Sequence, residues 1–450
     1  MIRGKEFTIS EYIPDIQTNS ISFNYITTFD DGTTHSFSDV LTFPTELTSA
    51  LLERKDVKRA LESVHIILGL SYFKMFIPPK ISLPYSLNAE QARFWNTLYT
   101  CGAGEFFYTN SLDFRGLIDF PVSESETHPI TSEYESSKAL ILHGGGKDSL
   151  VSVEITKTTD VDFDLFSLNT SVIQQIAAEA VGKNLHVVQR KIDPKMFELN
   201  ASGDAYNGHI SITMLYSFIA VLYATLTSDY RYVVTSCEAS SSIGNVEYLG
   251  IQVNHQWSKS IEAEEIIKDY IKKFVSVDVE YFSLLRPLSE IKIVELFCKH
   301  RQYFTKFSSS NHNFQQVKGK PSRWDIEYSR GKVEFVFALF TAFLPREDIL
   351  SIFEDNFYAD AKHIHRYSEL LGEKGIKPLE CVGTPEETAL AMHMASEKHL
   401  YDNDAVMQYF IQEVAPKLNF TKLKEEVFHY GNDSLIPETF RKALKSSLEN

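Results

Sequence analysis

Hydrophobic and polar residues alternate near the start of the chain in the manner of β-strands. Residues 21–26 read ISFNYI, and residues 36–42 resume the alternation after Asp30-Asp31-Gly32. Alternation predicts half-buried strands, and an Asp-Gly pair between two such strands favours a hairpin turn. Apolar side chains then recur at helical spacing over residues 46–75, and residues 88–99 predict a second helix. The start of the chain is therefore predicted to be a small α+β unit.

A different pattern begins at Lys138, where short apolar runs alternate with helical segments. The predicted strands are residues 138–142, 162–168, 185–191 and 232–236, and the predicted helices begin at Ser149 or cover residues 171–181 and 210–226. Strands that alternate with helices favour right-handed crossovers and a parallel sheet. The fold class is therefore predicted to be α/β.

Residues 121–137, PVSESETHPITSEYESS, separate the two patterns. They are rich in Ser, Thr, Glu and Pro and have little to bury, which is typical of a linker. We therefore predict an α+β domain over residues 1–120, this linker, a catalytic domain over residues 138–345, and a helical, peripheral region over residues 346–450.

The least polar stretch of the chain, residues 210–226, carries no charged residue. It is shorter than the about 20 residues that cross a bilayer, and Ser and Thr interrupt it. A buried core helix is therefore favoured over a membrane span. The first 15 residues lack the apolar region of a secretory signal. No membrane partner is expected.

Composition narrows the class of protein further. Of the 450 residues, 43% are hydrophobic and 23% are charged, as in ordinary soluble proteins. The formal net charge of −16 disfavours nucleic-acid binding, because an acidic surface repels phosphate backbones. The cysteines are far apart and form no CxxC pair, which disfavours a structural zinc site and favours a reduced, cytoplasmic protein. They are Cys101, Cys237, Cys298 and Cys381.

The sharpest motif is a glycine cluster, GGGKDS, between a predicted strand and a predicted helix. Its glycines permit positive φ and an inward-facing nest of N–H groups, which binds phosphate together with a helix N-terminus. Ser149 is expected to cap the helix and touch a phosphate oxygen, Lys147 to add positive charge, and Asp148 to orient the loop or approach a metal. A glycine-rich turn without a ligand is the alternative. The candidate cofactor-binding residues are Gly144, Gly145, Gly146, Lys147, Asp148 and Ser149.

Two common phosphate loops do not fit this cluster. The Walker pattern requires Ser or Thr where Asp148 stands, and the dinucleotide pattern requires glycine at Ser149. The run instead resembles the SGGxDS loop of the ATP pyrophosphatase (PP-loop) superfamily, with Gly144 in the first Ser position. That resemblance implies a PP-loop, adenine nucleotide alpha-hydrolase-like domain that binds ATP and Mg²⁺ and carries AMP to a substrate oxygen.

Further stretches resemble one family, the MurL epimerases, almost from end to end of the chain. They are residues 69–74 (GLSYFK), 102–106 (GAGEF), 144–152 (GGGKDSLVS), 197–200 (FELN), 206–210 (YNGHI), 253–259 (VNHQWSK), 281–290 (YFSLLRPLSE), 307–311 (FSSSN) and 377–383 (KPLECVG). No single stretch is decisive, but their order and number are specific.

The resemblance implies a reaction. Members of this family invert the terminal glutamate of UDP-MurNAc-L-Ala-L-Glu from L to D in peptidoglycan precursor synthesis, consuming ATP with Mg²⁺ and releasing AMP and pyrophosphate. A UDP-MurNAc-dipeptide substrate is therefore expected here. One departure stands out: the family carries a cysteine cluster after a tryptophan in the last third of the chain, whereas residues 323–332 read RWDIEYSRGK.

The resemblance and the residue chemistry together give the remaining candidates. The candidate catalytic residues are His255, Lys259, Glu238, Cys237 and His209, the candidate substrate-binding residues are Arg286, Asn254, Trp257 and Asn207, and the candidate metal ligand is Asp148. Structural roles stay open beside these: residues 254–259 can form a surface loop with a stacking Trp, Cys237 can be a buried thiol, and Arg286 can form a salt bridge.

Three weaker candidates complete the set. His363-Ile364-His365 resembles a metal pair but lies in a predicted helix, where side chains at i and i+2 diverge, so it is discounted. Tyr72 and Lys74 of the first domain are candidates to reach the substrate.

Two functions other than epimerisation also stay open. One is a different adenylating enzyme, either a ligase or a tRNA-thiolating enzyme, and the other is a non-catalytic nucleotide-binding relative. The oligomeric state is not predicted.

Overall fold

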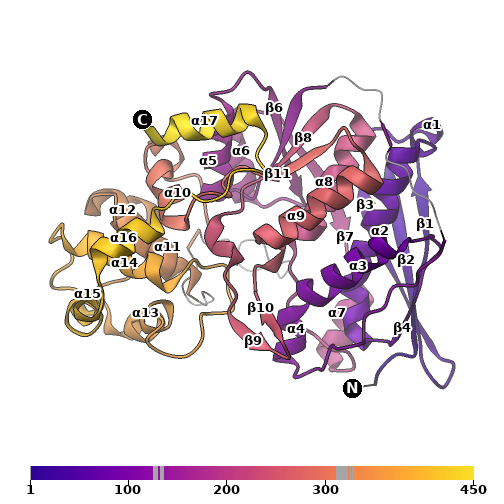
Figure 1. Ribbon diagram of the computed structural model, residues 1–450, viewed down its shortest axis with the longest axis horizontal. Helices are drawn as coiled ribbons and strands as arrows, with labels where there is room; N and C mark the ends of the chain where they lie inside the picture. Colours follow the sequence, from indigo (N-terminus) through magenta and orange to yellow (C-terminus); the bar gives the residue numbers. More distant parts are fainter. Residues whose placement is uncertain are drawn as a thin grey trace.

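A nine-stranded sheet runs through the molecule in the strand order β11-β8-β5-β6-β7-β3-β2-β1-β4 (Figure 1). The strands are β1 (Glu6–Asp15), β2 (Ser20–Thr28), β3 (Thr34–Thr42), β4 (Lys80–Ser82), β5 (Lys138–Leu142), β6 (Phe163–Leu168), β7 (Leu185–Lys191), β8 (Tyr230–Thr235) and β11 (Glu280–Ser283). The computed structural model describes residues 2–124, 130–131, 136–310, 323–324, 326, 329 and 331–449.

The five strands from β11 to β7 are parallel, as predicted. All six residues of β6 are buried, because helices cover both faces of this part of the sheet. The chain leaves β5 for β6 and β7 on one side and then crosses to β8 and β11 on the other. The order therefore reverses between β5 and β8, and in open α/β sheets ligands bind at such a point, outside the carboxyl ends of the strands.

The N-terminal strands extend the same sheet. The predicted hairpin is confirmed: β2 and β3 pair antiparallel from Ser20–Thr42 to Thr28–Thr34. β3 then pairs antiparallel with β7, so the N-terminal strands and the parallel strands belong to one sheet. A buried ion pair lies at this join, where Arg190 Nη2 is 2.6 Å from Asp39 Oδ2. One hydrophobic core underlies both parts, because residues as distant as Phe7, Phe166 and Phe218 pack in a single cluster.

Helices cover the sheet in two layers, one on each face. The layer that shares the core with the N-terminal strands contains α2 (Lys55–Phe76), α3 (Ala89–Gly102), α8 (Thr213–Thr227) and α9 (Ile261–Tyr270). The opposite layer contains α5 (Lys147–Thr156), α6 (Val172–Val181), α10 (Glu290–Phe297) and α17 (Glu438–Glu449). Neighbouring residues of β5 alternate between the two cores: Leu140 packs with the first layer and Ile141 with the second.

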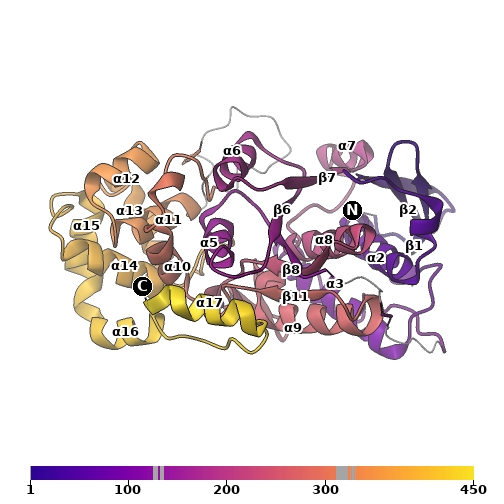
Figure 2. The same ribbon diagram turned by 90° about the horizontal axis from the view of Figure 1, so that it is seen from above.

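The C-terminal region is helical, as predicted. Its further helices are α11 (Lys332–Thr341), α12 (Arg346–Phe353), α13 (Ile364–Leu370), α14 (Pro385–Ser396), α15 (Ala405–Tyr409) and α16 (Phe420–Val427). They gather at the end of the molecule away from the N-terminal strands, and α17 returns to lie beside α5 (Figure 2). The region is not peripheral, however, because the loop between α13 and α14 reaches the carboxyl edge of the sheet.

Several element boundaries differ from the predictions. The helix predicted over residues 210–226 begins at Thr213, and the chain before it is a loop. The helix expected from Ser149 begins at Lys147, which changes the role of Ser149 as described below. Part of the predicted linker lies outside the described residues, at 125–129 and 132–135. Among the described residues, no helix combines the length and apolar character that crossing a membrane requires.

Candidate active site

The glycine cluster forms a tight loop at the carboxyl end of β5. Gly145 has φ of +72°, and a Cβ there would lie 3.0 Å from the Gln174 Cα, so both the backbone conformation and the space require glycine. Gly146 is the N-cap of α5, and no described side chain caps that end of the helix. The first N–H groups of α5 are therefore available to an anion at the point where the strand order reverses.

The two side chains that follow the glycines differ in exposure. Lys147 is fully buried, where it pairs with Glu290 and lies 2.5 Å from Asp148 Oδ1. The Asp148 side chain keeps 28% of its surface exposed while its carboxylate contacts Lys147. Burial alone would raise the pKa of Glu290, but Lys147 and Lys332 lower it to about 2. Glu290 is therefore an ionised counter-charge beneath the loop.

Ser149 does not cap α5, contrary to the prediction. It is the third residue of the helix, and its hydroxyl donates to the Gly146 carbonyl at 3.0 Å. The N-cap falls on Gly146, because α5 begins two residues earlier than the sequence pattern suggested. Two other hydroxyls, of Ser289 and Ser309, have no hydrogen-bond partner among the described residues, and Ser309 Oγ lies 3.6 Å from the position of a Cβ on Gly146.

Glu238 follows β8 at the same edge of the sheet. It is buried, and its Oε1 has no hydrogen-bond partner within the described part of the chain. Burial raises the pKa of this carboxyl, and the neighbouring negative charge of Glu290 raises it further. An unpartnered, buried carboxyl of this kind is suited to exchanging a proton or meeting a ligand.

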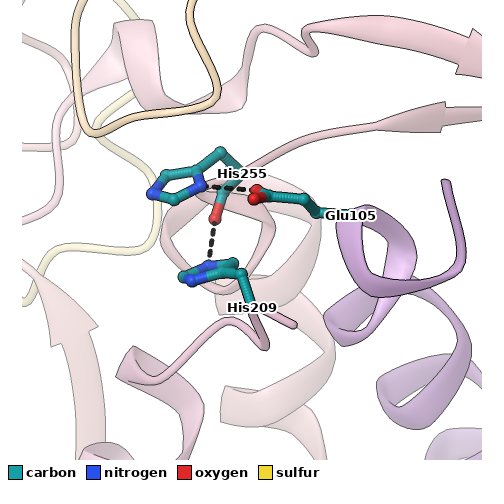
Figure 3. A group of neighbouring side chains, drawn as sticks. All are labelled: Glu105, His209 and His255. Carbon is teal, nitrogen blue, oxygen red and sulfur yellow. Dashed lines mark hydrogen bonds and ion pairs between the residues drawn. The ribbon is translucent and has the colours of Figure 1, made fainter. Parts of the chain in front are cut away.

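Two histidines and a glutamate form the next part of the site (Figure 3). His255 Nδ1 lies 2.5 Å from Glu105 Oε2, and Glu105 belongs to α4 (Gly104–Thr109). The His209 ring stacks on the His255 ring, with centroids 4.0 Å apart and planes 19° apart. Burial and the charge of His255 lower the pKa of His209 to about 4. In this stack the His209 imidazole is therefore neutral and the His255 imidazole is charged.

The loop between α13 and α14 brings a cysteine to this group. Cys381 Sγ lies 3.9 Å from Lys259 Nζ, and Glu380 Oε1 lies 3.8 Å from His255 Nε2. Burial would raise the pKa of the Cys381 thiol, but Lys259 and His255 lower it to about 7. Burial likewise would lower the pKa of His255, but Cys381 and Glu105 raise it to about 10. Cys381 and His255 thus form a thiolate–imidazolium pair near neutral pH.

Comparison with known proteins places the whole chain in one family. The model of the MurL N-terminal domain matches residues 2–284, and that of the MurL C-terminal domain matches residues 306–425. The chain belongs to the MurL family. No solved structure matches it.

Three curated relatives all carry the name UDP-N-acetyl-alpha-D-muramoyl-L-alanyl-L-glutamate epimerase. The protein of Xanthomonas oryzae pv. oryzae is 38% identical over 372 residues, which cover 82% of each chain. That of Salinispora tropica is 34% identical over 99% of this chain and 97% of its own, and that of a Micromonospora species is 35% identical over 98% of both.

The remaining predicted site residues of this MurL chain lie around the same edge. Arg286 is buried; it donates to Glu264 Oε2 at 2.6 Å and to the carbonyls of Glu238 and Lys259 at 2.7 Å each. Those contacts join the loop after β8 to the loop that carries His255 and Lys259, which is a positioning role. A direct contact of Arg286 with substrate stays a prediction.

The other polar candidates are also held by the protein itself. Asn254 donates to the Ser241 carbonyl at 2.8 Å, and the Trp257 indole is buried and donates to Glu262 at 3.1 Å. Asn207 is exposed, and its carbonyl accepts from Asn110. Cys237 is buried, and burial raises the pKa of its thiol to about 11. The roles of these four residues in substrate binding or catalysis stay predictions.

The weaker candidates have clear positions. Lys74 donates to the Gly208 carbonyl at 2.5 Å and so fixes the loop that carries His209, whereas Tyr72 donates to Asp39 at 3.2 Å in the buried pair between β3 and β7. His363 ends one helical turn and His365 lies in α13, and they face different glutamates, Glu334 and Glu369.

Sequence reasoning missed Cys381, Glu105, Glu290 and Glu380 as members of the site. The stretches GAGEF and KPLECVG resemble family segments and contain Glu105, Glu380 and Cys381, so those stretches were the available signal. Their proximity to His255 depends on contacts across more than 100 residues, which spacing along the chain does not reveal. The segment in which the resemblance leads one to expect a cysteine cluster is described only at residues 323–324, 326, 329 and 331–332.

Proposed function

We propose that this protein inverts the terminal L-glutamate of UDP-MurNAc-L-Ala-L-Glu to D-glutamate, at the expense of ATP and through an acyl-adenylate. The proposal rests on two features that lie at the same edge of the sheet. A glycine loop at a helix N-terminus lies close to buried groups suited to proton transfer, in a chain whose relatives are named as epimerases of this dipeptide.

The described residues fit an ATP polyphosphate. The α5 N-terminus presents uncapped N–H groups, Gly145 holds the loop in its positive-φ conformation, and the Ser309 hydroxyl, 3.6 Å from the position of a Cβ on Gly146, has no protein partner among the described residues. Hydroxyl and N–H donors of this kind are the ordinary ligands of phosphate oxygens. The strand order, which reverses beside this loop, supports a PP-loop type of nucleotide-binding domain.

Asp148 supports a Mg²⁺ site beside the same loop. It follows the glycines directly and is partly exposed, and Mg²⁺ is commonly held by one or two carboxylates together with phosphate oxygens. When bound, the ion would neutralise charge on the phosphates of ATP. Lys147 and Glu290 keep the Asp148 carboxylate in position, because the Lys147 ammonium pairs with both.

The reaction needs adenylation because the Cα proton beside a free carboxylate is very weakly acidic. In the first step an oxygen of the glutamate α-carboxylate bonds to the α-phosphorus of ATP, and the bond from that phosphorus to the bridging oxygen breaks, releasing pyrophosphate. In the acyl-adenylate the carboxyl group no longer carries a negative charge and its carbonyl withdraws electrons, so a base can remove the Cα proton and an acid can return one to the other face. Water then cleaves the adenylate to AMP and the inverted glutamate.

Lys259 is placed to stabilise the enolate that forms between those two proton transfers. Burial would lower the pKa of this ammonium, but Cys381 and Glu238 raise it, so it stays charged. A fixed ammonium in a buried site stabilises developing oxyanion charge strongly, since little water competes with it. Glu238 is a candidate proton carrier because its carboxyl is buried and unpartnered within the described chain.

The test is incubation of the full chain with ATP, Mg²⁺ and UDP-MurNAc-L-Ala-L-Glu, followed by acid hydrolysis, chiral analysis of glutamate and assay of pyrophosphate. The proposal predicts D-glutamate and pyrophosphate together. It also predicts neither product when α,β-methylene-ATP replaces ATP, because the bond that must break is then a carbon–phosphorus bond. Pyrophosphate without D-glutamate would mean a different adenylating enzyme, and neither product with ATP would refute the proposal.

A further inference from the structure

We propose that Cys381 is the proton carrier at one face of the substrate Cα, acting as a thiolate held in place by Lys259 and His255. This inference rests on the proposed function and adds a catalytic residue to it. Among the four cysteines it is the one that lies beside both a lysine ammonium and an imidazole.

The charges that face Cys381 come from several parts of the chain. Lys259, at the end of a short helical turn, and His255 lie on one side, and Lys332 of α11 adds positive charge from another. Glu380 precedes the cysteine, and Glu105 of α4 faces His255 on the far side of its ring. The net effect on the thiol is stabilisation of its anion.

The thiols of the other three cysteines differ from that of Cys381, because burial outweighs the charges around them. Burial raises the pKa of Cys101 and Cys237, to about 12 and about 11, and it raises the pKa of Cys298 as well. Those three are therefore neutral thiols at physiological pH. Cys381 is also partly exposed as a residue, whereas Cys237 is buried.

Proton transfer fits this cluster better than a metal ion. The ligand atoms of Glu105, His209 and His255 lie within 4.8 Å of one another, but two imidazole rings stacked with planes 19° apart direct their in-plane lone pairs nearly parallel, which disfavours one ion bound by both. An ion on Cys381 and His255 would face the Lys259 ammonium, 3.9 Å from the sulfur, and the two positive charges would repel. The ammonium already supplies the positive charge that a thiolate needs.

The loop that carries Cys381 is fixed rather than loosely placed. Asn245 donates to the Pro378 carbonyl at 2.8 Å, and Gln256 donates to the Val382 carbonyl at 3.2 Å. A Cβ on Gly383 would overlap the Glu387 carboxylate of α14 and lie 2.7 Å from the Phe335 ring of α11, so the loop packs against both helices with no room to spare. Contacts on both sides of the cysteine therefore hold its sulfur near Lys259 and His255.

The epimerisation step consists of two proton transfers at Cα. The thiolate sulfur takes the Cα proton of the acyl-adenylate, so an S–H bond forms, the C–H bond breaks, and its electron pair passes into the enolate. The Glu238 carboxyl gives its proton to the opposite face of Cα, so the enolate becomes an inverted Cα–H and Glu238 becomes a carboxylate. Exchange with solvent then restores both groups, and no oxidant or reductant is needed.

The first test compares Cys381→Ser and Cys381→Ala with Cys298→Ser, each in the full chain. Cys298 is a matched control because it lies outside the site and its thiol is neutral. Removing an acid or base group typically costs a factor of about 10²–10⁴. We expect epimerisation by both Cys381 variants to fall at least about 100-fold. Pyrophosphate release should stay close to that of the unmodified protein, and Cys298→Ser should leave both activities unchanged.

Solvent exchange separates proton transfer from a structural effect. In D₂O with ATP, the unmodified protein should exchange the Cα proton of both the L- and the D-glutamyl substrate. Cys381→Ser should lose exchange with one epimer and keep it with the other, because the second proton carrier remains. Exchange lost or retained equally with both epimers would overturn the assignment, as would a covalent acyl–Cys381 adduct detected by mass spectrometry.

A second measurement does not depend on the substrate. The rate of carbamidomethylation of Cys381 by iodoacetamide, followed by peptide mass spectrometry, should rise with a midpoint near pH 7. His255→Asn should move that midpoint upward, because it removes a positive charge beside the sulfur. A midpoint near the ordinary value for cysteine in the unmodified protein, about 8.5, would overturn the inference. If the unmodified protein shows no epimerisation but keeps the low midpoint, the proposed function fails while the thiolate stands.

Discussion

Replacing Gly145 by alanine tests the glycine loop at its most constrained position. Gly145 has φ of +72°, a conformation that alanine adopts at a cost of about 1–2 kcal/mol. The added Cβ would also lie 3.0 Å from Gln174 Cα and 3.3 Å from Gln174 N. These are backbone atoms in the first turn of α6, where Ser171 and Gln174 form a capping box, so they do not yield as a flexible side chain would.

The two effects together should lower the free energy of unfolding by about 2 kcal/mol. The loop must also shift by a few tenths of an ångström, which moves the N–H groups proposed to bind ATP. Misplacement of reacting groups by about 1 Å can cost a factor of about 100, so we expect pyrophosphate release to fall 10-fold or more. Urea unfolding measures the first quantity, and a coupled pyrophosphate assay with UDP-MurNAc-L-Ala-L-Glu measures the second.

Gly144→Ala is the matched control. Gly144 has no positive φ, and no described atom lies within 4 Å of a Cβ placed there. This variant should keep the stability of the unmodified protein, although it stands in the same motif. If Gly145→Ala retains both stability and pyrophosphate release, the described loop conformation is wrong.

Three further substitutions test other parts of the structure. Gly383→Ala should reduce epimerisation more than pyrophosphate release, because a Cβ there would overlap the Glu387 carboxylate and lie 2.7 Å from the Phe335 ring, and so must displace the Cys381 loop; equal losses of both activities would contradict this. Asp39→Asn should lower the free energy of unfolding by about 3–5 kcal/mol in urea, because it leaves the buried Arg190 charge without its carboxylate, and a smaller loss than about 1 kcal/mol would contradict that role. Burial and Glu290 raise the pKa of Glu387 to about 7, above its usual value of 4.5, so the folded protein binds a proton more tightly than the unfolded chain. This group therefore contributes stability that is present below pH 4.5 and is lost as the pH rises to about 7. Glu387→Gln should weaken that decline in a comparison of urea unfolding at pH 5 and pH 8, and an unchanged decline would refute the assignment.

Local signals in the sequence were sufficient for much of the fold. The Asp-Gly turn between two alternating segments marks the β2–β3 hairpin, and the apolar runs from Lys138 onward mark the parallel strands, because both patterns depend on neighbours in the chain. The pairing of β3 with β7 was not predicted. It joins segments about 150 residues apart, and its Asp39–Arg190 pair leaves no periodic signal in either segment.

The candidate site shows the same division. The glycine loop was recognisable because strand, glycines and helix are contiguous, and only the position of its N-cap was wrong. His255 and Lys259 were identified from a short polar segment that resembles the family. Cys381 was not, because a cysteine gains its reactivity from charges around it, and here those charges come from residues more than 40 positions away in sequence.

The most direct test of the central claim is the configuration and isotopic content of glutamate after reaction of the full chain in D₂O. With ATP, Mg²⁺ and UDP-MurNAc-L-Ala-L-Glu, the account predicts D-glutamate that carries one deuterium at Cα, formed with pyrophosphate and absent when ATP is omitted. Glutamate that stays entirely L and keeps its original proton under these conditions would contradict it.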